Sequence, residues 1–109
     1  MAGEDGEHLP LVVLAEKLGV SVGETRRCYP RIATVPFDSD YTFMATFHVL
    51  PFRGAESVVA LVKGGPDVIL DRCAVALGPD GQPVPITQAR REIDIANARL
   101  GGQGLRVMA

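Results

Sequence analysis

Residues 35 to 49 read VPFDSDYTFMATFHV, and this stretch decides how the chain is expected to fold. From Tyr41 onward the residues alternate in character, which is the pattern of a β-strand with two different faces. The face expected to join the core carries Tyr41, Phe43, Ala45, Phe47 and Val49. The other face, expected to floor a pocket, carries Thr42, Met44, Thr46 and His48. Phe37 precedes a turn of Asp38, Ser39 and Asp40, so we expect its ring at the mouth of that pocket.

The segments around this strand predict an α+β fold, with a twisted, mainly antiparallel β-sheet flanked by helices. Strands are expected over residues 32–37, 41–50, 57–63 and 105–109, and helices over 9–18, 66–72 and 87–100. Pro51 is expected to end the second strand and Thr87 to cap the last helix. The apolar run 58–62 lacks alternation, which predicts an inner strand covered on both faces. We expect residues 1–109 to form one domain, with residues 1–8 flexible.

Composition excludes several functional classes. The chain has 109 residues, a formal charge of -2 and a hydrophobic content of 47%, as in ordinary globular domains. A general nucleic-acid or anionic-membrane binder needs a basic surface, which this balance does not provide. No apolar run reaches the length of a membrane span. Cys28 and Cys73 lack metal-ligand spacing and are expected to be free thiols; we predict no metal site and no catalytic residue.

The strand-to-helix junction Lys63-Gly64-Gly65-Pro66 has the chemistry of an anion site. A lysine ends a strand, two glycines permit close backbone approach, and a helix N-terminus carries partial positive charge. A plain turn with a solvated lysine fits the same residues, so the pattern alone leaves both interpretations open. His48 fits a surface position or a hydrogen-bonded core position. The aspartates fit turn and helix-start positions; they are Asp38, Asp40, Asp67 and Asp71.

Three ordered stretches resemble one known family. They are PFDSDYTFM at 36–44, VKGGPDVILDRC at 62–73 and GLRVMA at 104–109. They are similar to the landmarks P-F-x-S-x-x-K-x-M, K-G-A-P-E and G-L-R-V-L-A of the nucleotide-binding (N) domain of P-type ATPases, in the non-heavy-metal, cation-pumping branch. The segment LAEKLG at 14–19 also resembles that domain. The resemblance covers nearly the whole chain in the right order.

The resemblance implies an ATP-binding cytoplasmic domain of an integral membrane pump. It implies that Phe37 stacks on adenine, that Lys63 lines the pocket beside base and phosphates, and that Gly64 and Gly65 let the nucleotide lie close. It further implies that Arg106 holds phosphate oxygens and that Met44 and Met108 form an apolar wall. ATP is the expected ligand, as Mg-ATP in the full-length protein.

Three positions depart from the family pattern. Thr42 stands where many members carry lysine, and Ser39 stands where some carry arginine, so two cations that would meet the nucleotide are absent. The family's glutamate that contacts the adenine amino group falls on His8, with Glu7 beside it. The sequence leaves open which of these two residues, if either, contacts the adenine amino group.

The resemblance places the reaction outside this chain. The family's phosphorylated Asp-Lys-Thr-Gly-Thr segment is absent, so the fragment is expected to bind ATP without hydrolysing it, as a monomer that contacts neither nucleic acid nor membrane. Its expected partners are the P domain, whose aspartate takes the phosphoryl group, and the actuator domain of the same parent chain. One alternative is an interaction or regulatory module with weak or lost nucleotide binding. A stand-alone α+β enzyme is a weaker alternative.

Overall fold

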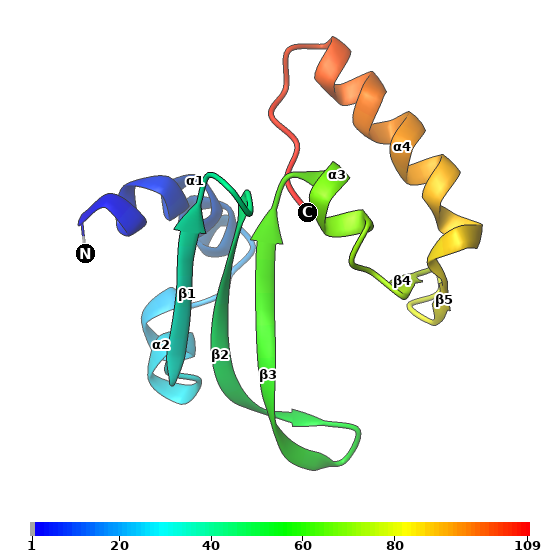
Figure 1. The fold of residues 1–109 in the computed structure, drawn as a ribbon. Coiled ribbons are helices and arrows are strands. Elements are labelled where there is room, and N and C mark those ends of the chain that lie inside the picture. The colour runs from blue at the N-terminus through cyan, green and yellow to red at the C-terminus, as the bar shows by residue number, and fades with distance from the viewer. Residues whose placement is uncertain (1) are drawn as a thin grey trace. The chain divides into compact units, whose positions relative to one another are not determined.

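The computed structural model describes residues 2–109, with side chains from Leu9 onward. In chain order the elements are α1 (Ala2–Lys17), α2 (Val22–Cys28), β1 (Ala33–Asp38), β2 (Phe43–Phe52), β3 (Ala55–Gly64), α3 (Pro66–Leu70), β4 (Val75–Leu77), β5 (Pro83–Pro85) and α4 (Ile86–Gly102). Strands β1, β2 and β3 form one sheet in that order, and β4 pairs antiparallel with β5 (Figure 1). The predicted α+β fold with a mainly antiparallel sheet is confirmed. No helix in the described part of the chain is long and apolar enough to cross a bilayer.

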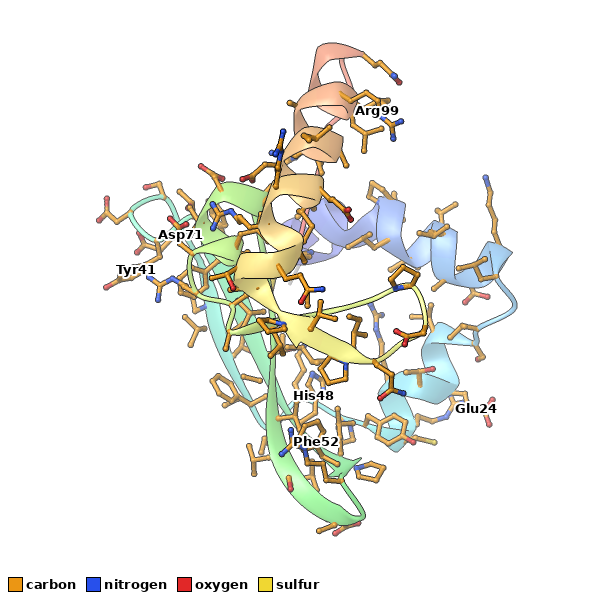
Figure 2. The ribbon with its side chains drawn as sticks, turned by 90° about the vertical axis from the view of Figure 1, so that its right-hand side faces the viewer. Glu24, Tyr41, His48, Phe52, Asp71 and Arg99 are labelled. Carbon is orange, nitrogen blue, oxygen red and sulfur yellow. The ribbon has the colours of Figure 1, made fainter. Side chains whose placement is uncertain are left out.

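The chain divides into two compact units. The first comprises Met1–Ala33 and Phe47–Ala60, and the second comprises Thr34–Thr46 and Leu61–Ala109. In the first unit α1 contacts α2, and the hydroxyl oxygen of Ser21 caps α2 by accepting the Glu24 N–H at 3.2 Å. His48, labelled in Figure 2, places its Nδ1 2.8 Å from the Tyr29 carbonyl oxygen. These contacts satisfy polar groups at the C-terminal end of α2 as well as at its start.

The second unit contains the two-stranded sheet and the two C-terminal helices. Helix α4 contacts α3, β4 and β5. The guanidinium of Arg90 on α4 donates to Asp71 at 2.9 Å and to Asp94 at 3.2 Å, which joins the end of α3 to α4. The hydrogen bond with Asp71 is the main cause of a raised pKa for Arg90. This exposed ion pair links the segment that follows α3 to α4.

A two-residue turn sets the register of the β2–β3 hairpin. Arg53 and Gly54 both have positive φ, 52° and 81°, as a type I′ turn requires. Such a turn makes β2 and β3 antiparallel, and a regular ladder from it places Phe43 opposite Gly64 and Met44 opposite Lys63. The prediction that Pro51 ends β2 is wrong, because β2 continues to Phe52. In this register the backbone nitrogen of Pro51 faces away from β3. The N–H group that proline lacks is therefore not needed for a hydrogen bond to β3.

Burial differs from the predicted two-faced strand. The buried hydrophobic side chains of the described residues are Met44, Ala45 and Leu70, at 7%, 4% and 6% exposure. Met44 and Ala45 are consecutive, so β2 is covered on both faces near its start rather than on one face along its length. Tyr41 precedes the strand and is 56% exposed, and Val49 is 43% exposed. The prediction of a single core face is therefore wrong.

Several predicted boundaries also change. Strand β3 lies at an edge of the three-stranded sheet and exposes Val58 and Leu61, so it is not covered on both faces. Helix α1 begins at Ala2 rather than at residue 9, and the N-cap of α4 is Pro85 rather than Thr87. Residues 105–109 do not form a strand. The predicted flexibility of residues 1–8 and the single domain stay predictions.

Candidate functional site

The loop between β1 and β2 is closed by hydrogen bonds to Asp38. Its carbonyl oxygen accepts the N–H groups of Tyr41 at 3.1 Å and Thr42 at 2.7 Å, and its carboxylate accepts the Asp40 N–H at 2.7 Å. Thr42 has φ 59°, which is uncommon for a β-branched residue. Its hydroxyl donates to the Tyr41 carbonyl oxygen at 2.7 Å. The short side chain of Thr42 is therefore engaged with the backbone of its own loop.

Gly64 lies directly against the residues that follow this loop. A Cβ placed on Gly64 would lie 2.6 Å from the Thr42 carbonyl oxygen and 2.9 Å from the Phe43 Cβ. Real Cβ atoms do not approach so closely, so only glycine fits without movement of β2. This proximity agrees with the register in which Phe43 stands opposite Gly64. The glycine predicted to admit a nucleotide is thus also required by the packing of β2 on β3.

Met44 and Lys63 are cross-strand neighbours in the same register. Residues directly opposite in an antiparallel pair place their side chains on one face, with Cβ atoms about 4.5–5.5 Å apart. Met44 is 7% exposed and Lys63 is half-buried. The thioether and the lysine stem therefore share one face of the sheet, opposite to the face of Phe43.

The C-terminal residue of the chain contacts the end of β3. Gly64 and Ala109 exchange both of their backbone hydrogen bonds, each at 2.9 Å. This is a single antiparallel pair, and it brings the GLRVMA segment beside Lys63-Gly64-Gly65. Figure 1 shows the C-terminus close to the start of α3. Arg106 and Met108 on this segment are exposed, Met108 by 42%.

Gly65 connects β3 to a very short helix. It is the N-cap of α3 with φ −64° and ψ 138°, and no side chain caps this N-terminus by a hydrogen bond. A Cβ on Gly65 would lie 3.0 Å from the Asp67 Oδ1, so the carboxylate folds back toward this residue. Helix α3 has five residues, little more than one turn. Its partial charge is correspondingly small, and an acidic side chain already lies beside its first turn.

Phe37 and Ser39 flank the end of β1. Phe37 is the residue before Asp38, the last residue of β1, and its side chain is 55% exposed. Ser39 follows in the loop and is exposed. The aromatic ring is thus accessible next to the loop that precedes β2.

The structure brings most of the predicted residues together in the second unit. The loop residue Thr42, the strand residues Met44, Lys63 and Gly64, and the chain end converge at one end of the hairpin, with Phe37, Ser39 and Gly65 adjacent in sequence. The side chains of Glu7 and His8 lie outside the described residues.

Sequence reasoning missed one contact beside this group. The Arg72 guanidinium lies over the Phe43 ring, with the guanidinium carbon 4.9 Å from the ring centroid. The Tyr41 ring is tilted relative to the Phe43 ring, and the two ring centroids are 6.0 Å apart. The Arg53-Gly54 turn contained the signal that Phe43 faces Gly64. No sequence periodicity predicts the contact of Arg72 with Phe43, because this contact depends on the path of the chain after α3.

Three basic residues belong to the converging segments. Lys63, Arg106 and Arg72 lie on or next to the three converging segments, and no group of three His, Cys, Asp or Glu in the described part of the chain is placed to hold a metal ion. Separate cations with an accessible aromatic ring suit a ligand that has both a planar base and an anion.

Comparison with known proteins identifies the family of the chain. Residues 4–109 match the family described as P-type ATPase, cytoplasmic domain N. A cation-transporting ATPase of Synechocystis is 35% identical over 99 residues, which cover 91% of this chain and 10% of that protein. A calcium-transporting ATPase of Listeria monocytogenes is 32% identical over 106 residues, covering 96% of this chain and 12% of that protein.

A vertebrate relative gives the same result. The sodium/potassium-transporting ATPase subunit alpha-1 of Catostomus commersonii is 35% identical over 109 residues, covering 99% of this chain and 10% of that protein. The chain therefore spans about a tenth of the length of these relatives. The resemblance carried by the three motifs is confirmed, and the chain belongs to the family of P-type ATPase cytoplasmic N domains.

Proposed function

We propose that the second unit binds ATP at the convergence of the three motifs. The observation that carries this proposal is the double hydrogen bond between Gly64 and Ala109, each N···O distance being 2.9 Å. It joins the two segments that carry Lys63 and Arg106, while Gly64 packs on the Thr42 loop. Residues far apart in the chain thereby meet at one end of one hairpin.

The proposed roles are those that the family resemblance implies, and each agrees with the chemistry of a purine triphosphate. The 55% exposed ring of Phe37 offers a π-face on which adenine stacks. Lys63 supplies a point charge beside the base and phosphates, and Arg106 supplies a planar, bidentate donor for phosphate oxygens. Met44 and Met108 add apolar surface, and Gly64 and Gly65 leave the backbone accessible. Thr42 and Ser39 line the same end without a cation.

In a parent pump this unit would hold ATP for phosphoryl transfer to an aspartate in a separate P domain. Positioning of the γ-phosphate makes that transfer effectively intramolecular, and such positioning together with electrostatic stabilisation accounts for most of the catalysis in such reactions. Mg²⁺ would neutralise phosphate charge when bound with ATP. The P and actuator domains, cation transport and an integral membrane setting belong to this proposal, and the isolated chain would bind ATP without turnover.

Isothermal titration with Mg-ATP tests the proposal on matched variants. Phe37→Ala removes a 55% exposed ring, and Phe52→Ala removes a 53% exposed ring at the other end of the hairpin. We expect Phe37→Ala to weaken binding about 5- to 150-fold, because base stacking on an aromatic ring is worth about 1–3 kcal/mol. Phe52→Ala should bind as the unmodified chain does. Equal affinities for all three proteins would contradict the assignment of Phe37.

A second candidate is an interaction or regulatory module on the same scaffold. It is favoured by Thr42, whose side chain carries no charge and whose hydroxyl is hydrogen-bonded to the Tyr41 carbonyl oxygen at 2.7 Å. Ser39 likewise provides no cation. No binding at millimolar ATP by a folded sample would favour this function over the first.

A further inference from the structure

A closed chain of contacts ties the proposed site to α3. Gly64 leads through Gly65 into α3, and the segment after α3 returns Arg72 to Phe43, which stands against Gly64. Asp71, beside Arg72, is held by Arg90 of α4 at 2.9 Å. The residue next to Arg72 is therefore linked to a second element. Arg72 and Phe43 together connect the start of β2 to the end of β3.

We propose that Arg72 is a positioning residue for the nucleotide site, acting through Phe43 to hold the Thr42 loop against Gly64. This inference rests on the proposed function. Arg72 lies on the Phe43 face of the sheet, opposite to the face of Met44 and Lys63, so it acts on the site through the backbone of β2. A guanidinium over an aromatic face is a stabilising arrangement, and here its carbon is 4.9 Å from the centroid.

The Thr42 conformation makes such a clamp necessary. A β-branched residue at φ 59° persists only when its surroundings fix it. Part of that constraint is the loop itself, through the bond from the Thr42 N–H to Asp38 at 2.7 Å. A second constraint acts at Phe43, the next residue, whose ring is in contact with the Tyr41 ring and lies under the Arg72 guanidinium. Release of Phe43 would let the Thr42 carbonyl move away from Gly64.

The test compares Arg72→Gln, Arg72→Lys and the control Arg99→Gln. Arg99 is an exposed arginine in the last turn of α4, and Figure 2 shows it well separated from Asp71. Arg72→Gln should weaken Mg-ATP binding about two- to fivefold, the range expected from loss of an exposed cation–π contact. Arg72→Lys, which keeps the charge, should recover most of the affinity, and Arg99→Gln should not change it.

Amide spectra without ATP separate this inference from the proposed function. In Arg72→Gln the amide signals of Thr42, Phe43 and Gly64 should shift. The three-bond HN–Hα coupling constant of Thr42, which reports its φ, should also change. If the unmodified chain fails to bind ATP, the proposed function fails, and these shifts still decide whether the clamp exists. Unchanged signals, unchanged affinity in Arg72→Gln, or an equal loss in Arg99→Gln would overturn the role of Arg72.

Discussion

Gly64→Ala tests the packing on which the site depends. The added Cβ would lie 2.6 Å from the Thr42 carbonyl oxygen and 2.9 Å from the Phe43 Cβ. Neither atom is the end of a flexible side chain, so β2 or β3 must move. Overpacking of this kind costs about 1–3 kcal/mol, and the reduced freedom of the unfolded chain returns about 0.4–1 kcal/mol. The difference spans about 0–2.6 kcal/mol of unfolding free energy, and we expect a net loss in the middle of that range, about 1–2 kcal/mol.

Thermal unfolding followed by circular dichroism measures this loss. A destabilisation of that size lowers Tm by about 5 to 15 °C in a domain of this length. The matched control is Gly101→Ala in α4, where a Cβ would meet nothing within 4 Å. That variant should be more stable by about 0.5–1 kcal/mol, because alanine has the higher helix propensity. Equal Tm values for the two variants would refute the packing of Gly64 against Thr42.

Three further predictions concern the turn, the loop and the ion pair. Gly54→Ala should lower the unfolding free energy by about 1 kcal/mol in urea titrations, because φ is 81° although no atom lies within 4 Å of the added Cβ. Thr42→Lys should tighten ATP binding about fivefold in calorimetry, because it adds a cation beside the proposed phosphate site. Arg90→Gln should lower Tm slightly by removing the contacts to Asp71 and Asp94, and the effect should shrink as salt is raised.

Turns that depend on local sequence were predictable. Gly54 follows Arg53 between two apolar segments, which indicates a tight turn, whereas the register of Phe43 opposite Gly64 follows from the positive φ that the structure shows at both residues. The turn of Gly78-Pro79-Asp80-Gly81 also forms as its composition predicts, with the Gly78 N–H bound to the Gln82 carbonyl oxygen at 2.8 Å. These features depend on residues close in the chain.

Burial and strand position were less predictable, because they depend on what covers each element. The apolar run in β3 fits a covered inner strand, yet β3 is an edge of the sheet and Val58 is 64% exposed. Alternation along β2 did not indicate that Met44 and Ala45 are both buried. The left-handed conformation of Thr42 had no sequence signal, since threonine rarely adopts it.

The most direct test of the account is an ATP titration followed by amide chemical shifts, with and without Mg²⁺. Localised, saturating shifts are predicted at Phe37, Thr42, Lys63 and Arg106, with no change at Phe52. A folded sample that gives a flat titration, or whose saturating shifts fall at Phe52 and not at Lys63 and Arg106, would contradict the claim that the three motifs converge to bind ATP.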